Sequence, residues 1–369
     1  MKVPFVDLYR QYNAHQDDLD AAVDTVVQDT AFISGPYARR FESAFADFLG
    51  LSHVVGCANG TDAIELALSA LGVGSGDEVI VPALTWISTA ESVSAVGATP
   101  IFADIDPETY TLDLDDTAQC ITDSTAAIIP VHLYGQMADM PALCRLAEQE
   151  NIKIVEDAAQ AHGAQLRGRP AGSWGDAATF SFYPSKNLGA WGDAGAVATD
   201  DNALARSVRH LTNHGQPQKH QHEVEGRNSR LDGIQAAVLL AKLPHLSDWN
   251  QQRRRHADRY DRLLSDLPGV STPTRRSDGT HVFHLYVIEY ARRDTLASFL
   301  SERGIATSVH YPVALPFQPC YADYGHVQSD FPHAAAATDR ILSLPMFPEM
   351  TEKEEAYVAN AIQDFCLHA

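Results

Sequence analysis

Lys186 is the residue of this chain best suited to covalent chemistry, because it follows an apolar run and begins a glycine-rich turn. Residues 179 to 197 read Thr-Phe-Ser-Phe-Tyr-Pro-Ser-Lys-Asn-Leu-Gly-Ala-Trp-Gly-Asp-Ala-Gly-Ala-Val. Apolar surroundings lower the pKa of an amine, and a neutral amine can form a Schiff base with a carbonyl compound. The chain has only six lysines, and the other five lie at the terminus, before a strand, in a polar loop or on predicted helices: Lys2, Lys153, Lys219, Lys242 and Lys353.

Asp157 is the candidate acid. It ends an apolar run and is the second residue of the stretch Glu-Asp-Ala-Ala-Gln, residues 156 to 160. A carboxylate in such a place must be paired or solvated, and a cationic ring nitrogen would be a suitable partner.

Gly60 and Thr61 are candidates for binding a phosphate, and Trp86 is a candidate for stacking on a ring. A Gly-Thr pair at a helix N-terminus offers free amides, a hydroxyl and the positive end of the helix dipole. The same pair could also be a turn with an N-cap that binds nothing, and Trp86 taken alone fits a place in the core better than a cofactor contact.

The alternation along residues 180 to 183 separates two faces of a strand. Phe180 and Phe182 point to one side, and Ser181 and Tyr183 point to the other. We expect the phenylalanines to pack in the core while Ser181 and Tyr183 face the site.

The elements that must position these residues alternate between strands and helices. Apolar, β-branched runs predict strands at 53–58, 78–82, 99–105, 126–133, 152–156, 178–183 and 194–199, with helices at 61–71, 88–96 and 141–150 between several of them. This pattern indicates an α/β fold with a mainly parallel seven-stranded sheet covered on both faces. Ligands of such sheets bind outside the carboxyl ends of the strands, where the candidate residues converge.

A second, smaller unit follows. The pattern from 231 to 264 predicts a long helix bent or broken at Pro244, and beyond it come a strand at 282–289, a helix at 294–303 and a final helix at 352–365. We therefore predict a large domain over 1–245 and a small α+β domain over 246–369. The N-terminal segment, about residues 1–30, could pack on the small domain.

Composition excludes several classes of partner. A formal net charge of -21 opposes binding to nucleic acid or to an anionic membrane. The five cysteines include no C-x-x-C pair, the N-terminus has no apolar signal region, and no long apolar run occurs, so a cytoplasmic protein is expected. His214, His220 and His222 have a spacing that could bind a metal, but a solvated or intersubunit loop explains them more simply, and we expect no metal.

A lysine amine, an acid for a ring nitrogen, an aromatic ring for stacking and a Gly-Thr-Ser set for a phosphate together meet the needs of pyridoxal phosphate. No single residue is specific for this cofactor. Their common position at one rim of the sheet makes the joint case much stronger than that of any one residue.

The chain resembles the DegT/DnrJ/EryC1/StrS family of sugar aminotransferases, which have the aspartate aminotransferase fold (fold type I). The resemblance runs nearly end to end, and its motifs occur in the family's order: Gly35-Pro36 with Phe41-Glu42, Cys-Ala-Asn-Gly-Thr-Asp-Ala (57–63), Ile-Ile-Pro-Val-His-Leu-Tyr-Gly-Gln (128–136), Glu-Asp-Ala-Ala-Gln-Ala-His-Gly-Ala (156–164), the stretch around Lys186, Asn-Ser-Arg-Leu-Asp (228–232) and His-Tyr-Pro (310–312).

The resemblance implies a role for each matching residue. Lys186 would form the Schiff base and move the proton, and Asp157 would keep the pyridine nitrogen protonated. Gln160 would contact the phenolic oxygen, Trp86 would stack on the ring, and Gly60, Thr61 and Ser181 would bind the phosphate. Asn228 would reach the phosphate of the neighbouring subunit, which implies a homodimer. The candidates for contacting the sugar nucleotide are Tyr183, Arg230, His310 and Tyr311.

The stretch around Lys186 also bears on the reaction. Dehydratase relatives have histidine in place of the lysine, so amino transfer is favoured here. Relatives that aminate C3 of the sugar tend to read Phe-Tyr-Pro-x-Lys-Asn-Leu-Gly-Ala, as this chain does, whereas those that aminate C4 tend to read Phe-His-Ala-Thr-Lys-Asn. The resemblance thus implies a 3-keto sugar nucleotide, dTDP- or UDP-linked, as acceptor, glutamate as donor, and a cofactor that passes through its pyridoxamine form. A 4-keto sugar aminotransferase and a pyridoxal phosphate-binding regulator without turnover are the alternatives.

Overall fold

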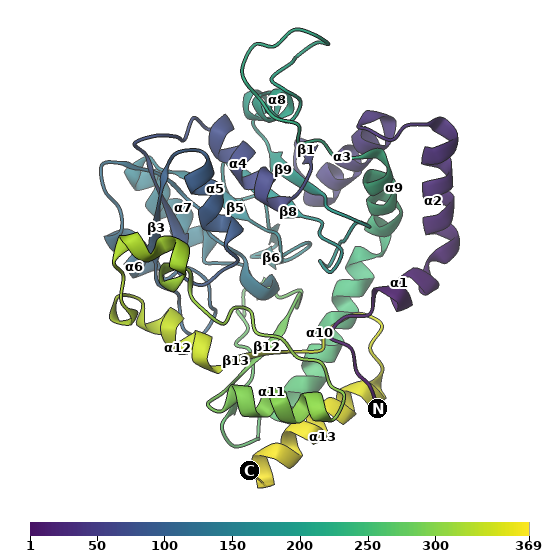
Figure 1. The fold of residues 1–369 in the computed structure, drawn as a ribbon, viewed down its shortest axis with the longest axis vertical. Helices are drawn as coiled ribbons and strands as arrows, with labels where there is room; N and C mark the ends of the chain where they lie inside the picture. The colour runs from purple at the N-terminus through teal and green to yellow at the C-terminus, as the bar shows by residue number, and fades with distance from the viewer. Residues whose placement is uncertain (369) are drawn as a thin grey trace.

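A seven-stranded sheet forms the centre of the computed structural model, which describes residues 1–368 (Figure 1). Its order is β1 (His53–Cys57), β9 (Gly195–Thr199), β8 (Ala177–Ser181), β5 (Lys153–Asp157), β4 (Thr125–Ile128), β2 (Glu78–Pro82) and β3 (Thr99–Ala103). Only β9 runs antiparallel to its neighbours. The predicted mainly parallel sheet of seven strands is therefore confirmed.

Helices cover both faces of this sheet. Strand residues alternate between two apolar clusters, so that Ile80 belongs to one cluster and Val79 and Val81 to the other. One face carries α3 (Gly35–Leu49), α7 (Met140–Glu150) and α9 (Gly233–Lys242), and the other carries α4 (Gly60–Ala70), α5 (Ser88–Ala95) and α8 (Asn202–Leu211). Burial on both faces explains why the strands read as continuous apolar runs.

The phenylalanines of residues 180 to 183 pack as expected. Phe180 and Phe182 are fully buried, and their rings meet Phe45 edge to face at centroid distances of 5.0 and 5.3 Å. Ser181 and Tyr183 point away from this cluster and line the cavity described below. The strand itself ends at Ser181, two residues earlier than predicted, so Phe182 and Tyr183 continue the alternation just beyond β8.

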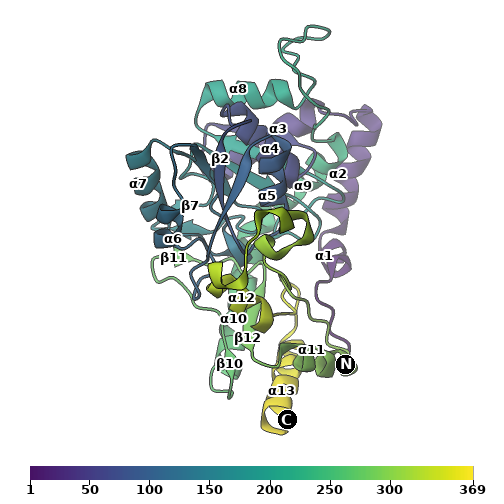
Figure 2. The same ribbon diagram turned by 60° about the vertical axis from the view of Figure 1, so that its left-hand side comes forward.

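The C-terminal part is built on α10 (Leu246–Leu264), which follows α9 after a short 3-10 turn at Leu243–His245. The long helix, predicted to be bent or broken at Pro244, is thus interrupted there by the 3-10 turn. A three-stranded sheet in the order β10 (Val270–Ser271), β12 (Tyr286–Tyr290) and β13 (Ile341–Leu344) packs with α11 (Arg293–Glu302) and α13 (Glu352–His368). Figure 2 shows these elements on one side of the central sheet.

The strand predicted at 282–289 begins later than expected, at Tyr286. The N–H groups of Val282 and Leu285 donate instead to the carbonyls of Gly135 and Tyr134, at 2.9 and 3.2 Å. These bonds tie the segment before β12 to the large sheet's loops. Contacts between distant parts of the chain therefore set the start of this strand.

The N-terminal segment touches both parts of the molecule. Val3 donates to the carbonyl of Gly304 at 2.9 Å, and Arg10 forms an ion pair with Glu354 at 2.7 Å, whereas α2 (Gln16–Asp29) packs on α9. The domain boundary after residue 245 stays a prediction.

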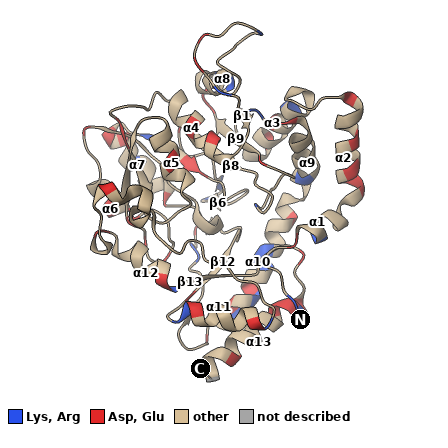
Figure 3. Ribbon diagram, viewed as in Figure 1, with Lys and Arg blue, Asp and Glu red and all other residues tan. Residues whose placement is uncertain are grey.

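Between α8 and α9 the chain forms a loop that projects beyond the body of the molecule (Figures 1 and 2). Residues 217–226 of this loop are exposed, whereas Ser229 and Leu231, closer to α9, are buried. The 48 acidic residues outnumber the 27 basic ones, and α2 carries acidic residues but no Lys or Arg (Figure 3). Within residues 1–368, no helix has the length and apolar character that a bilayer crossing requires.

Candidate active site

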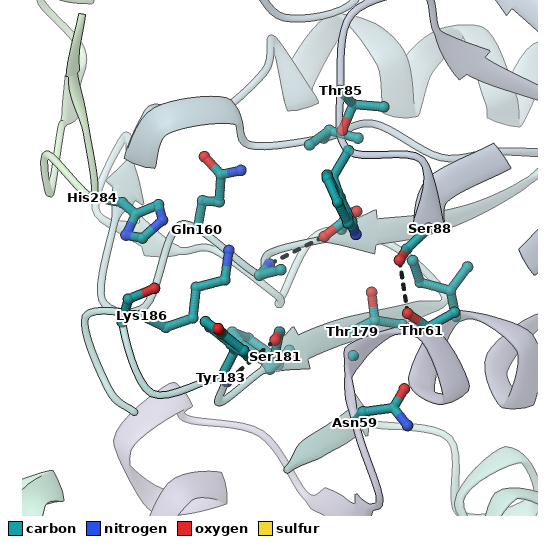
Figure 4. Close-up of a pocket in the computed structure, with 18 of the residues that line it drawn as sticks. Asn59, Thr61, Thr85, Ser88, Gln160, Thr179, Ser181, Tyr183, Lys186 and His284 are labelled. Carbon is teal, nitrogen blue, oxygen red and sulfur yellow. Dashed lines mark hydrogen bonds between the residues drawn. The ribbon is translucent and has the colours of Figure 1, made fainter. Parts of the chain in front are cut away.

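A cavity of about 700 Å³ opens at the carboxyl ends of the central strands. Ten of the twelve predicted site residues line it, contributed by the loops after β1, β2, β5 and β8 and by the segment around residue 310: Gly60, Thr61, Trp86, Asp157, Gln160, Ser181, Tyr183, Lys186, His310 and Tyr311. Figure 4 shows several of them pointing into a common space. The parallel sheet explains this convergence, since its strands end at one rim.

Asn228 and Arg230 do not line the cavity. Both lie on the segment that leads from the projecting loop back to α9, where Asn228 is exposed and pairs with Asn213, and Arg230 donates to the side-chain oxygen of Asn213 at 3.3 Å. Within one chain, these two predicted residues are therefore separate from the other ten.

Lys186 lies on a tight turn after β8. Its N–H donates to the carbonyl of Tyr183 at 2.8 Å, and the turn closes so that a Cβ on Gly189 would lie 2.2 Å from the carbonyl oxygen of Pro184. Lys242 holds the same turn, because its amine donates to the Gly189 carbonyl at 2.8 Å. Residue 189 must therefore be glycine, because a side chain at this position would clash with the backbone of Pro184.

The Lys186 amine has no hydrogen-bond or ion-pair partner among residues 1–368. Burial lowers the pKa of this amine to about 8, and the Asp157 carboxylate opposes that shift. A substantial fraction of the amine is therefore neutral near physiological pH, as a Schiff-base lysine requires.

Asp157 lies at the end of β5 and is buried. One carboxyl oxygen accepts a hydrogen bond from the Thr89 hydroxyl at 3.0 Å, and the other accepts one from the Ala159 N–H at 3.1 Å. Burial raises the pKa of the carboxyl, while these two donors lower it. A cation placed against this buried group would be strongly favoured.

The cradle for an anion forms where α4 begins. A Cβ on Gly60 would lie 2.6 Å from the Cβ of Ser181, so the absence of a side chain lets the helix start approach β8. The Thr61 hydroxyl lies 2.7 Å from that of Ser88, and Asn59 caps the helix by accepting from the Asp62 N–H at 2.8 Å. Hydroxyls and free amides thus surround the positive end of a helix.

Aromatic residues border the cavity. The side chain of Trp86 is 56% exposed, and its ring centroid lies 5.6 Å from that of Tyr311. The core placement weighed for Trp86 is therefore wrong. Gln160 accepts from the Tyr134 N–H at 2.8 Å, and its amide nitrogen donates to the Tyr311 hydroxyl at 3.3 Å.

His310 is fixed beside these aromatic residues. Its Nδ1 lies 2.8 Å from the hydroxyl oxygen of Ser343, and its ring stacks on Phe5 with centroids 5.7 Å apart. Burial lowers the pKa of His310 to about 4, and the nearby Lys186 ammonium adds to the shift. The imidazole is therefore neutral at physiological pH.

The polar residues of this site that sequence reasoning missed include Ser88 and His284, which line the cavity, and Thr89, which donates to Asp157. Ser88 and Thr89 begin the predicted helix after the second strand, so a search for hydroxyls at helix starts could have found them. His284 falls inside a predicted strand of the small domain, and nothing in the sequence places that segment at the cavity.

The histidines of the projecting loop have a different arrangement from a metal site. His222 donates from Nδ1 to the backbone carbonyl of His214 at 2.7 Å. Among residues 1–368, no group of three or more His, Cys, Asp or Glu side chains is arranged to hold a metal ion.

The residues of the cavity fit pyridoxal phosphate on their own geometry. The unpartnered amine of Lys186 suits the aldehyde, the buried carboxylate of Asp157 suits the ring nitrogen, and the cradle at Gly60 and Ser181 suits the phosphate. The fold and these three features define a pyridoxal phosphate-dependent aminotransferase of fold type I.

Residues 13–363 match the DegT/DnrJ/EryC1/StrS aminotransferase family, and the chain belongs to it. The crystal structure of S. venezuelae DesV in complex with a ketimine intermediate is similar to this structure, with a TM-score of 0.98 and 44% identity. The match covers 100% of this chain and 99% of that one. The resemblance stated from the motifs is thereby confirmed.

Two relatives frame the question of substrate. The chain is 46% identical to a "Pleiotropic regulatory protein" of Geobacillus stearothermophilus, over 100% of both chains. It is 44% identical to a UDP-N-acetyl-3-dehydro-alpha-D-glucosamine 3-aminotransferase of Acidithiobacillus ferrooxidans, over 98% of this chain and 97% of the relative.

Proposed function

We propose that the protein transfers an amino group from glutamate to a 3-keto sugar nucleotide, UDP- or dTDP-linked. Such a reaction serves deoxyamino sugar biosynthesis for a surface polysaccharide or a glycosylated metabolite. The observation that carries the proposal is a single cavity that joins the Lys186 amine, the Asp157 carboxylate and the cradle at Gly60.

Each of the central residues would act on a particular part of the bound cofactor. The bound cofactor supplies an electron sink that stabilises negative charge at the carbon next to the transferred nitrogen. Lys186 would hold the cofactor covalently and then carry the proton, since its lowered pKa suits a base. Asp157 would keep the ring nitrogen protonated, and the Gln160 amide would contact the phenolic oxygen.

The remaining cofactor contacts are assigned by position. Trp86 would stack on the ring from the exposed side of the cavity. Gly60, Thr61 and Ser181 would bind the phosphate through an amide and two hydroxyls at the start of α4. Tyr183, His310 and Tyr311 would face the sugar nucleotide.

A homodimer would complete the site. A loop between α8 and α9 projects from the body, and Asn228, on the segment that leads back to α9, is exposed to solvent. In a dimer, Asn228 would reach the phosphate of the neighbouring cavity, and Arg230 would bring a guanidinium to the anionic sugar nucleotide. Neither residue lines its own chain's cavity, which is consistent with a role in the neighbouring one.

Two observations favour C3 of the sugar. The chain reads Phe-Tyr-Pro-Ser-Lys before Asn187, in the manner of C3-aminating relatives, and a 44% identical relative is named a 3-aminotransferase. A non-catalytic regulator is the second candidate, since another relative bears a regulatory name. The Lys186 amine and the Asp157 carboxylate are the two groups that amino transfer needs, so their presence in the cavity favours a catalytic function over a regulatory one.

The test is incubation of the holoenzyme with glutamate and a panel of 3-keto and 4-keto sugar nucleotides, UDP- and dTDP-linked. We expect 2-oxoglutarate to form and the NMR spectrum of the product to place the new amine at C3. Exclusive amination at C4 would refute the regiochemistry. A protein that binds the cofactor but converts no member of the panel and no glutamate would support the regulator instead.

A further inference from the structure

His284 brings the C-terminal part of the chain into the wall of the cavity. It lies on the segment before β12, its side chain is only 8% exposed, and it lines the same cavity as Lys186. Figure 4 shows its ring near Lys186 and Gln160, on the side away from Thr61 and Ser181. The Lys186 amine therefore lies between His284 and the phosphate cradle.

The ring nitrogens of His284 have no partner within the described chain. Nδ1 is fully buried, and neither nitrogen forms a hydrogen bond to any residue from 1 to 368. Buried polar atoms are nearly always hydrogen-bonded, so an unpaired buried imidazole beside a cavity indicates a partner that is met during function. His281, three residues earlier and also 8% exposed, differs, because its Nδ1 accepts from the Phe283 N–H at 2.9 Å.

The backbone around His284 is held in place from both parts of the molecule. Arg253 donates to the carbonyls of Phe283 and His284 at 3.1 and 3.3 Å, and the Leu285 N–H donates to Tyr134 at 3.2 Å. The amide of Asn187, the residue after Lys186, donates to the carbonyl of Val282 at 3.0 Å. The turn that carries the amine is thus bonded directly to the segment that carries the imidazole.

The imidazole is neutral in this setting. Burial holds the pKa of His284 well below its usual value, and the cations of Lys186 and Arg253 add to the shift. The other titratable groups electrostatically coupled to Lys186 are the Asp157 carboxylate and the neutral rings of His162 and His310. A neutral imidazole keeps one nitrogen lone pair and can accept a hydrogen bond from an ammonium group.

We propose that His284 is a positioning residue for Lys186: when the free, protonated amine turns toward the ring, the neutral imidazole accepts a hydrogen bond from it. The flexible four-carbon stem of lysine lets the amine turn toward the ring. The bond stabilises the protonated amine and holds it at the cavity wall. His284 thereby raises the pKa of Lys186 above the value that burial alone would set.

The inference rests on the proposed role of Lys186, and its test needs neither cofactor nor substrate. The cofactor-free protein is treated with an amine-selective reagent across a range of pH, and each lysine is followed by peptide mass spectrometry. Lys242, another buried amine with its pKa lowered to about 8, serves as an internal reference. The readout is the titration midpoint of Lys186 and not enzyme activity. The result therefore does not depend on whether the protein aminates a sugar nucleotide.

We expect His284→Phe to lower the labelling midpoint of Lys186 by about one pH unit, a tenfold change in the ratio of amine to ammonium. His284→Asn, which keeps an acceptor oxygen, should restore the midpoint toward that of the wild type. His281→Phe is the matched control and should leave Lys186 unchanged. If His284→Phe does not fold, His284→Leu gives the same readout with a smaller side chain.

Two results would overturn the proposal. One is a Lys186 midpoint that stays at the wild-type value in His284→Phe or His284→Leu. The other is an equal shift in the His281→Phe control or at Lys242, because a general loosening of the structure would produce it.

Discussion

Gly60→Ala tests the phosphate cradle through a steric clash that the structure defines. The added Cβ would lie 2.6 Å from the Cβ of Ser181 and 3.2 Å from both its Cα and its Oγ. Carbon atoms normally pack about 3.5–4.0 Å apart, so the helix start must move away from β8 by roughly 1 Å. Overpacking of this kind costs about 1–3 kcal/mol. If that cost falls on the cofactor-bound state, affinity for pyridoxal phosphate falls about 5- to 150-fold.

The assay is a titration of the cofactor-free variant with pyridoxal phosphate, followed by the absorbance of the Schiff base, and repeated with pyridoxal, which lacks the phosphate. We expect a large loss for pyridoxal phosphate and a small one for pyridoxal. Gly74→Ala is the matched control, because its Cβ would meet only the Val96 carbonyl oxygen at 3.7 Å. Wild-type affinity in Gly60→Ala, or equal losses for the two ligands, would refute the assignment.

The other predictions concern the two groups expected to perform the chemistry. Lys186→Ala should abolish both the yellow Schiff-base absorbance and amino transfer, measured by spectrophotometry and 2-oxoglutarate release; a variant that still transfers amino groups would contradict the lysine assignment. Asp157→Asn should keep the cofactor, because Thr89 and Ala159 can still hold the side chain, yet lose activity. The loss of a charge-assisted hydrogen bond of about 1.5–3 kcal/mol corresponds to a rate about 10- to 150-fold lower, and full activity would contradict the role at the ring nitrogen.

The central sheet was predictable because strands buried on both faces give long apolar runs. Lys186, Asp157 and Gly60 were predictable as neighbours for a related reason, since the carboxyl ends of parallel strands share one rim. No helix was predicted over α3, although Phe41, Phe45 and Leu49 recur at the four-residue spacing of a helix face and are buried.

The rest of the site depends on contacts between distant parts of the chain. His284 reaches the cavity because the Val282 and Leu285 amides bond to the loop at Tyr134 and Gly135, and local sequence contains no signal for that pairing. Asn228 and Arg230 show a further limit. Their motif predicts a role in the site, but a single chain does not bring them to it.

The turn that carries Lys186 also joins the two parts of the molecule. Lys242, at the last turn of the helix that leads to Pro244, bonds to this turn through Gly189, and Asn187 bonds to Val282 on the other side. The turn that carries the amine is therefore bonded to both parts of the molecule. A rearrangement of the C-terminal elements relative to the sheet would therefore pull on the peptide groups beside Lys186, and we expect it to change the reactivity of this amine.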